Sequence, residues 1–350
     1  MGPPHHSAAN RNIIAIGTSA GGVEALRFLA SRLPADLPAA VIVTLHLARA
    51  FKSEMDAILS RAGPLPASFA ADGVPIENGH IYIAPADRHL LVEAGHLLLG
   101  HGPHENNARP AIDPMFRSVA LCCGYHSVGV VLTGALGDGA SGLHALKRAG
   151  GLAVVQDPND ASVPDMPLSA LSRAKPDYVK PLAELPALLR QLTALAPGDR
   201  VPPPSTLKYE VEVARRGHTS GHTSGHTSMD EMDRIGTRSV LSCPDCGGVM
   251  WEVEDGDLLR YRCHVGHAYT AEHMKLAMDE TLRRALGSAA RVLEERVALV
   301  RTLAAEAAQH GRTHLARSWA EHEREAQREL SVIREAAGRL DQVSAETTAA

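Results

Sequence analysis

The sequence predicts an α/β fold in which a doubly wound, largely parallel sheet carries helices on both faces. Over residues 12–197, short apolar runs of strand length alternate with stretches of helical periodicity. This alternation is the pattern of parallel strands joined by crossover helices. The runs are apolar at nearly every position, as expected for strands that are covered on both faces.

The strands and helices of this domain are predicted from the periodicity of apolar residues and from the glycines that border these segments. Strands are expected in the apolar runs 12–17, 39–46, 80–85, 90–99 and 127–134. Helices are expected where apolar residues recur three and four apart, at 22–33, 51–63, 113–124, 138–150 and 184–195. Asp113 is expected to cap its helix. Cys122 and Cys123 are expected in or near the core of that same helix.

Three further segments follow this catalytic domain (12–197). Residues 198–236 are rich in proline and then repeat GHTS three times, which predicts a flexible linker; metal binding by the repeated histidines is the alternative. Residues 237–272 hold clustered cysteines and predict a small zinc-binding element. Residues 273–345, rich in Ala, Glu, Arg and Leu with a break near Gly311, predict a helical hairpin or an oligomerising coiled coil.

The totals exclude several classes of function. The net charge of -5 gives no basic face for nucleic acid, and 3% aromatic residues offer no platform for stacking bases. No run approaches the roughly 18 apolar residues that a membrane helix needs, so membrane insertion is not expected. The amino terminus lacks the apolar core of a secretory signal, which predicts a cytoplasmic protein.

A serine stands on the first strand-to-helix turn. Ser19 lies between a predicted strand and a predicted helix, with Gly17, Gly21 and Gly22 around it. Small residues permit a sharp turn, and such a turn projects a hydroxyl from the carboxyl edge of the sheet, close to the N–H groups of a helix amino terminus. Phosphate binding is the alternative, but the dinucleotide pattern G-x-G-x-x-G is interrupted by Ser19 and no Walker lysine follows.

A base and an acid stand at two further strand ends. His46 ends the second predicted strand, and Asp138 follows the strand at 127–134. A serine hydroxyl needs a base to take its proton, and an aspartate can orient that base while also capping a helix. Capping alone is the alternative for each residue. The chain order Ser, His, Asp differs from that of the α/β-hydrolases, so their topology is not predicted.

With these residues, the sequence resembles the catalytic domain of the CheB family of chemotaxis receptor methylesterases. The resemblance covers residues 12–197 and rests on these blocks in order: IGTSAGGVEAL, VTLHLARAF, IYIAPADRHLLV, ARPAIDPMFRSVA, VVLTGALGDGASGL and QDPNDASVPDMP. It implies hydrolysis of glutamate γ-methyl esters on chemoreceptors, often with deamidation of glutamine. It also implies Ser19 as nucleophile, His46 as base and Asp138 as orienter, with no cofactor for catalysis. Backbone N–H groups near Ala20 and Ala135 are expected to hold the oxyanion.

Two departures from the family pattern bear on regulation and substrate fit. The best-known members begin with a phosphoacceptor receiver, whereas only about eleven residues precede the first strand here, so a stand-alone catalytic domain is expected. The family loop usually reads TGMGNDG, whereas this chain has TGALGDG, with Ala135 in place of the methionine and Gly137 in place of the asparagine.

A second constellation of residues predicts a metal site. Cys243 and Cys246 are followed by two glycines, which permit the turn that points two thiolates at one ion, and Cys263 is followed by His267. Four sulfur and nitrogen ligands in two close pairs suit a closed, structural zinc site. His264 is the competing fourth ligand, and free thiols are the alternative reading.

The sequence therefore predicts a serine esterase that acts on a methylated chemoreceptor or a related signalling protein. A sensory kinase, a methyltransferase and a second copy of the chain through its C-terminal helices are further candidate partners. A methylesterase-like docking module of weak activity is the main alternative function. A nucleic-acid-binding zinc ribbon is a third reading, which the lack of a basic face opposes.

Overall fold

The computed structural model describes residues 10–46, 53–216, 229–255 and 258–349. The chain divides into two compact units, Met1–Met274 and Lys275–Ala350. No helix in the described part of the chain is long and apolar enough to cross a membrane.

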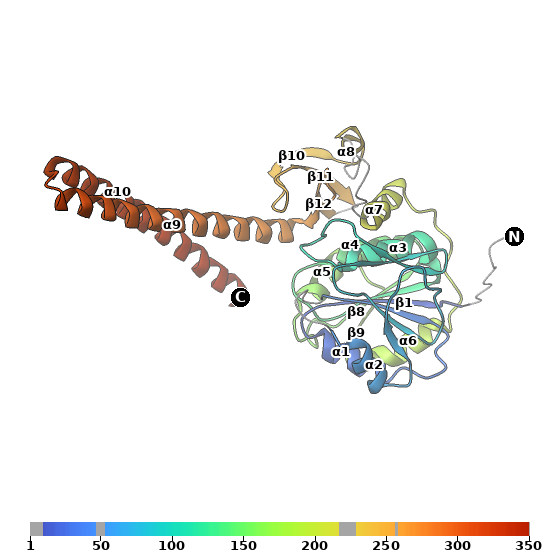
Figure 1. Cartoon of the computed structure of the whole chain (residues 1–350). Helices are drawn as coiled ribbons and strands as arrows, with labels where there is room; N and C mark the ends of the chain where they lie inside the picture. The colour runs from blue at the N-terminus through green and yellow to red at the C-terminus, as the bar shows by residue number, and fades with distance from the viewer. Residues whose placement is uncertain (1–9, 47–52, 217–228, 256–257, 350) are drawn as a thin grey trace. The chain divides into compact units, whose positions relative to one another are not determined.

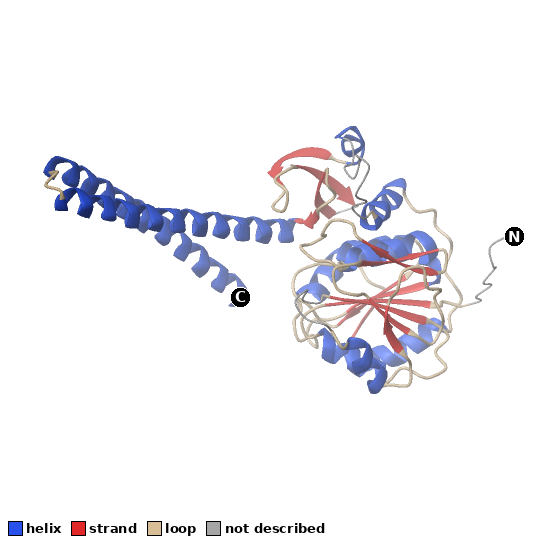
Figure 2. Ribbon diagram, in the orientation of Figure 1, coloured by secondary structure: helices blue, strands red, loops and turns tan. Residues whose placement is uncertain are grey.

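A parallel sheet of seven strands forms the centre of the first unit (Figures 1 and 2), in the order β3-β4-β2-β1-β7-β8-β9. The chain winds outward in both directions from the neighbours β1 and β7, which confirms the predicted doubly wound fold. The strands are β1 (Ile13–Thr18), β2 (Ala40–Leu45), β3 (Ala67–Phe69), β4 (Ile81–Ile83), β7 (Ser127–Val131), β8 (Leu152–Gln156) and β9 (Tyr178–Lys180).

Helices cover both faces of this sheet (Figure 2). Ile14 and Ile16 of β1 belong to a core with α1, α2 and α6, whereas Ile13 and Ala15 belong to a core with α3, α4 and α5. The consecutive apolar residues at 13–16 of β1 are therefore explained, because alternate side chains enter two different cores. The helices are α1 (Gly22–Ala30), α2 (Met55–Ala62), α3 (Ile112–Cys123), η1 (Gly124–His126), α4 (Ala140–Arg148), α5 (Asp165–Ala174), η2 (Leu182–Glu184) and α6 (Leu185–Thr193).

The structure differs from two local expectations. The run 90–99 is not one strand but an antiparallel hairpin of β5 (His89–Glu93) and β6 (His96–Gly100), because Ala94 and Gly95 take positive φ and reverse the chain. Asp113 does not cap α3; it lies in the first turn, where its carboxylate accepts from Gly142 N–H of α4.

One of the two cysteines of α3 also differs from expectation. Cys122 is exposed, whereas Cys123 is half-buried and packs against the core, as expected. Both lie in the last turn of the helix, where the buried stripe of α3 has already ended.

Part of the predicted linker 198–236 is helical. It contains α7 (Ser205–Arg215) and α8 (Met229–Ile235), while the GHTS repeats at 217–228 lie outside the described residues. Leu207 and Val213 of α7 are buried, and so is the carboxylate-bearing Glu210. Composition alone predicted a linker because these apolar residues are few and the partners of Glu210 lie far away in sequence.

An antiparallel four-stranded sheet follows, in the order β10-β11-β12-β13. Its strands are β10 (Thr237–Ser242), β11 (Val249–Asp255), β12 (Leu258–Cys263) and β13 (Ala268–Thr270). We call residues 237–270 the Cys/His element. Trp251 and Val253 of β11 pack with Met232 of α8 in a small core, and Met250 and Tyr269 of the element are also buried.

The second unit is helical, as predicted. It is formed by α9 (Ala271–Gln309), which begins in the first unit, and by α10 (Thr313–Ala349). The chain reverses at Gly311, whose φ is +69°. Ion pairs such as Arg301–Glu323 and Arg334–Glu294 join the two helices along their length, which gives an antiparallel hairpin.

Candidate active site

Ser19 lies on the turn between β1 and α1. Its N–H donates to Thr133 O at 3.1 Å, and its carbonyl oxygen accepts from Gly22 N–H at 2.9 Å. Gly21 has φ +77°, and a Cβ atom there would lie 2.9 Å from Ser162 Cβ. A glycine at this position is therefore needed for the sharp turn that presents Ser19.

His46 and Asp138 meet at the same edge of the sheet. His46 follows β2 and Asp138 lies in the loop after β7; these strands flank β1. His46 Nε2 lies 2.8 Å from Asp138 Oδ2, with the side chain of His46 23% exposed and that of Asp138 fully buried. The hydrogen bond places the proton of a neutral His46 on Nε2, which leaves Nδ1 as the ring atom that can accept a proton.

A cavity of ≈ 590 Å³ opens at this edge. Ser19, His46 and Ala135 all line it, so the structure brings the expected nucleophile, the expected base and one expected oxyanion residue to one space. Ala20 follows Ser19 directly, and its carbonyl oxygen accepts from Thr133 Oγ1 at 3.0 Å. Leu136, beside Ala135, has φ +67° and is exposed.

The Asp138 carboxylate is held by several donors. Ile112 N–H donates to Oδ2 at 2.6 Å, while Asn106 Nδ2 and Gly139 N–H each donate to Oδ1 at 2.9 Å. Burial raises the pKa of this carboxyl, but the hydrogen bond and charge of His46 and these donors outweigh burial and hold its pKa well below the usual range. Asp138 is thus anionic beside His46, and it caps the amino terminus of α3.

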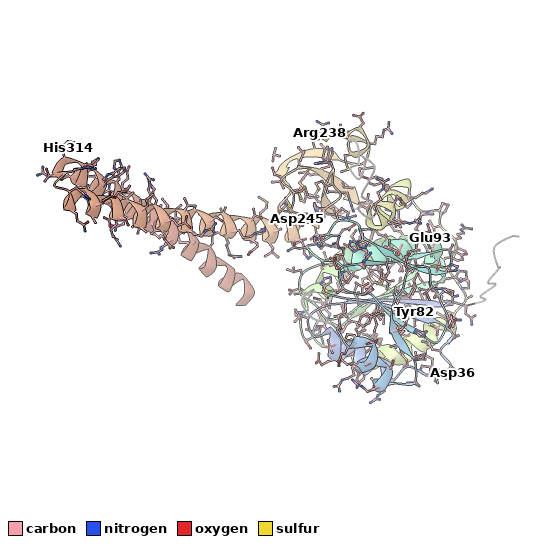
Figure 3. All side chains as sticks on the ribbon, viewed as in Figure 1. Asp36, Tyr82, Glu93, Arg238, Asp245 and His314 are labelled. Atoms are coloured by element: carbon pink, nitrogen blue, oxygen red, sulfur yellow. The ribbon has the colours of Figure 1, made fainter. Side chains whose placement is uncertain are left out.

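The residues of this site that were not predicted from the sequence include three that bear on its chemistry. Asn106, Asp245 and His273 also line the cavity. Asp245 comes from the turn between β10 and β11 (Figure 3), and His273 lies in the first turn of α9. Burial lowers the pKa of His273 to about 4, so its imidazole is neutral at pH 7. No motif marked these residues, because each reaches the cavity from an element distant in sequence.

The cysteines form a compact group with one histidine. The ligand atoms of Cys243, Cys246, Cys263 and His267 all lie within 4.8 Å of one another. Cys246 Sγ and Cys263 Sγ are 3.7 Å apart. His267 Nδ1 lies 3.6 Å from Cys243 Sγ and 3.5 Å from Cys263 Sγ. His267, rather than His264, completes this group.

The ionisation of Asp113 is expected to make the stability of the protein depend on pH. Burial and the charge of Asp138 raise its pKa from 3.8 to about 7. Between these values the native state keeps a proton that the unfolded chain has released, so stability falls as pH rises from about 4 to 7. Asp113→Asn cannot ionise. We expect its free energy of unfolding, relative to wild type, to rise across this window by up to about 4 kcal/mol.

Urea unfolding at intervals from pH 4.5 to 8 measures this difference. Asp36→Asn, at an exposed loop position, is the matched control for the chemical change. A difference between Asp113→Asn and wild type that is constant across the window would contradict the raised pKa.

Comparison with known proteins agrees with this geometry. The model of the CheB methylesterase family matches residues 14–189. A protein-glutamate methylesterase/protein-glutamine glutaminase of Hydrogenovibrio crunogenus is 38% identical over 53% of this chain and 50% of its own length. One from Xanthomonas campestris is 39% identical over 53% and 52%, respectively. The chain thus spans about half the length of the curated relatives it matches.

A solved structure matches the same region. The catalytic domain of the Thermotoga maritima CheB methylesterase superposes with a TM-score of 0.50 and 31% identity, covering 52% of this chain and 98% of that domain. The family match extends over half of the sequence and contains Ser19, His46 and Asp138. With the parallel sheet and the cavity at its carboxyl edge, these findings lead to one assignment: the chain belongs to the CheB methylesterase family.

Proposed function

We propose that the chain is a serine esterase that hydrolyses glutamate γ-methyl esters on a chemoreceptor-like signalling protein. The observation that carries this proposal is the 2.8 Å contact between His46 Nε2 and the buried Asp138 carboxylate, beside a cavity that Ser19 also lines. A nucleophile, a base and an orienting anion in one space are the parts that acyl transfer requires. The names of the relatives support the substrate class.

The reaction follows from the placement of these groups. Ser19 Oγ attacks the ester carbonyl carbon while His46 Nδ1 takes its proton, and Asp138 stabilises the imidazolium that results. N–H groups near Ala20 and Ala135 hold the oxyanion. The tetrahedral intermediate collapses, and methanol leaves with the proton from His46. Water, activated by the same imidazole, then hydrolyses the acyl-enzyme to release the glutamate carboxylate. A glutamine amide reacts in the same way, with ammonia leaving.

Location and partners are further parts of this proposal. The five cysteines are free thiols in the structure, which suits a reducing compartment such as the cytoplasm. The methylated receptor is the proposed partner, and its modified side chain must enter the cavity at the sheet edge. Contacts with a sensory kinase or a methyltransferase, and self-association through α9 and α10, stay predictions of the sequence.

The test is methanol release from a receptor fragment that carries γ-methyl glutamate, with ammonia release from the glutamine form measured in parallel. We expect methanol at a rate that saturates with substrate, together with a loss of the methyl mass from the receptor peptide. If folded, metal-loaded protein releases neither product but binds the fragment, the chain is a docking module rather than an esterase.

We further propose that the Cys/His element binds one structural zinc ion. Tetrahedral zinc, with bonds of about 2.3 Å to sulfur and 2.0–2.1 Å to nitrogen, places two sulfurs about 3.8 Å apart and a sulfur and a nitrogen about 3.6 Å apart. The 3.7 Å between Cys246 and Cys263 and the 3.5–3.6 Å from His267 Nδ1 to its two cysteines fit these values. Four protein ligands leave no open position, which favours a structural role.

The surroundings of His267 support the same assignment. Its Nε2 lies 3.8 Å from Asp245 Oδ2, and Tyr269 Oη donates to that oxygen at 2.7 Å. Metal-bound histidines commonly direct their second ring nitrogen at a carboxylate, which fixes the tautomer. Asp245 therefore suits the role of orienting the ligand, with its oxygen held in turn by Tyr269.

Replacing one of the four ligands is expected to cause loss of the metal. Cys243→Ser is expected to weaken zinc binding by more than the roughly 10–100-fold that the loss of an outer-shell partner costs, because a thiolate ligand itself is removed. Native mass spectrometry should show one zinc per wild-type chain and none in the variant at equal zinc. Cys122→Ser, the same change at an exposed cysteine of α3, should keep its zinc. Equal zinc in all three proteins would refute the assignment.

A further inference from the structure

The Cys/His element is joined to the α/β domain by hydrogen bonds to Asn106, one to its main chain and one to its side chain. Asn106 N–H donates to Ala268 O at 2.8 Å, and Thr270 N–H donates to Asn106 Oδ1 at 3.1 Å. Glu105 and Ala268 form a parallel bridge. Strand β13 thus pairs with the segment at 105–106. This segment belongs to the α/β domain and borders the cavity. Asp245 and His273, on either side of β13 in sequence, line the cavity as well.

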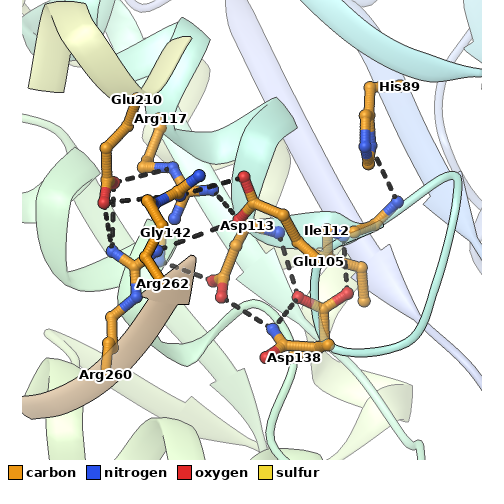
Figure 4. Close-up of polar contacts among 12 residues, drawn as sticks. His89, Glu105, Ile112, Asp113, Arg117, Asp138, Gly142, Glu210, Arg260 and Arg262 are labelled. Atoms are coloured by element: carbon orange, nitrogen blue, oxygen red, sulfur yellow. Dashed lines mark hydrogen bonds and ion pairs between the residues drawn. The ribbon is translucent and has the colours of Figure 1, made fainter. Parts of the chain in front are cut away.

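A buried cluster of charges fixes this docking (Figure 4). Glu105 forms an ion pair with Arg117 of α3, and it accepts from Arg262 of β12 at 3.2 Å. Glu210 of α7 pairs with Arg260 of β12 at 2.8 Å and with Arg117 at 3.2 Å. All five residues are buried, at 0–6% exposure. Separation of the element would leave the carboxylates of Glu105 and Glu210 without Arg260 and Arg262, which is costly for buried groups.

Asn106 connects this docking to the esterase centre. Its Nδ2 donates to Asp138 Oδ1 at 2.9 Å and to Asp113 Oδ2 at 3.0 Å, while its Oδ1 accepts from Thr270 N–H. The side-chain amide of Asn106 therefore donates to both carboxylates and accepts from the Cys/His element. Asn106 has φ +50°, a conformation that asparagine tolerates better than most residues. The element holds the amide, and the amide holds Asp138.

We propose that Asn106 is a positioning residue for the esterase centre, held by the docked Cys/His element, so that metal loading of the element controls the geometry of Asp138 and His46. This inference rests on the proposed function for its effect on catalysis. The ligands Cys263 and His267 border the turn that leads directly into β13, so loss of zinc releases this turn and frees Ala268 and Thr270 from Asn106. Asp138 then loses the amide donor that orients its carboxylate toward His46.

Steady-state kinetics with the full chain test the role of Asn106. Zinc-loaded Asn106→Ala is expected to lose roughly 10–100-fold in kcat, the range typical of outer-shell partners, with KM within about threefold of wild type because Asp138 is needed in the transition state rather than in binding. Chelation of zinc should produce the same split between kcat and KM. An unchanged kcat in Asn106→Ala that remains folded would overturn the proposal.

A docking variant separates metal binding from positioning. Arg262→Met removes the contacts of this guanidinium to Glu105, Glu210 and Gly266 O and leaves the four metal ligands in place, so we expect one zinc per chain but a lowered kcat. Arg238→Met, in the same sheet, removes an exposed ion pair with Asp233 and is the matched control; it should keep both zinc and kcat. Arg262→Met with wild-type kcat would show that docking does not support the centre.

Hydrogen exchange gives a readout that does not require activity. The N–H groups of Asn106 and Ile112, which donate to Ala268 and to Asp138, report on the two ends of the connection. On chelation we expect peptides covering 105–113 to exchange at least about tenfold faster, together with those of the Cys/His element. Faster exchange in the element alone would overturn the proposal. If wild type hydrolyses no ester, the proposed function fails, and exchange still decides the coupling.

Discussion

Ser19→Ala is expected to lower kcat for methyl-ester hydrolysis by roughly 10⁵–10⁶-fold, as the loss of a triad serine does elsewhere. The variant keeps His46, Asp138 and the oxyanion donors, so the remaining rate comes from those donors and from binding alone. No stability change is expected, because Ser19 is half-buried and its main-chain contacts to Thr133 and Gly22 do not use the hydroxyl. Methanol release under single-turnover conditions measures the effect without interference from product release.

The matched control for this variant is Ser31→Ala. Ser31 lies at the other end of α1 and is exposed, and its hydroxyl donates to Phe28 O. It should leave kcat unchanged while sharing the chemical change and the helix. A Ser19→Ala rate within tenfold of wild type would show that another group, or water held by His46, attacks the ester. The fold assignment would survive that result, but the proposed mechanism would not.

The strand ends could be predicted from sequence because they depend on local patterns. Apolar runs that end at Ser19, His46 and the loop of Asp138 set out three parallel strands, and parallel strands bring their carboxyl ends to one edge. The order of β2, β1 and β7 in the sheet was not needed for that prediction. Two very short strands were missed, because β3 and β9 have three residues each and give no period to detect. Two longer elements, β8 and α5, were also not predicted.

The other half of the site depends on contacts between distant segments. Asn106 lies 32 residues from Asp138 and 164 from Thr270, and only the folded chain brings the three together. Arg117 is fully buried on α3, and a buried arginine needs an acid partner. The sequence does not say which acid, because Glu105 and Glu210 lie in segments with loop or linker composition.

Asp138→Asn is expected to lower kcat by about 10⁴-fold, as a change of histidine tautomer does in a comparable triad. The environment of Asp138 fixes which way the amide of the variant turns. Oδ1 accepts from Asn106 Nδ2 and from Gly139 N–H, so the amide oxygen must occupy that position. The amide NH₂ then faces His46 Nε2 and drives the proton of the imidazole to Nδ1, which can no longer accept from Ser19.

The same substitution should also lower stability, by about 1–3 kcal/mol for an unpaired buried donor, because the new NH₂ group opposes Ile112 N–H, which donates to Asp138 Oδ2 at 2.6 Å in the wild type. Because the pKa of Asp138 is depressed in the native state, its ionised form stabilises the fold above the pKa of the unfolded chain, and this stabilisation is lost as pH falls through the native pKa. The difference in free energy of unfolding between wild type and the variant should therefore shrink in acid. Urea unfolding at pH 7 and pH 3 measures this, with Asp36→Asn as control. A variant of normal stability and normal kcat would mean that Asp138 neither orients His46 nor caps α3. Loss of kcat with stability unchanged would separate the two roles, leaving the orientation of His46 as the reason for an acid at this position.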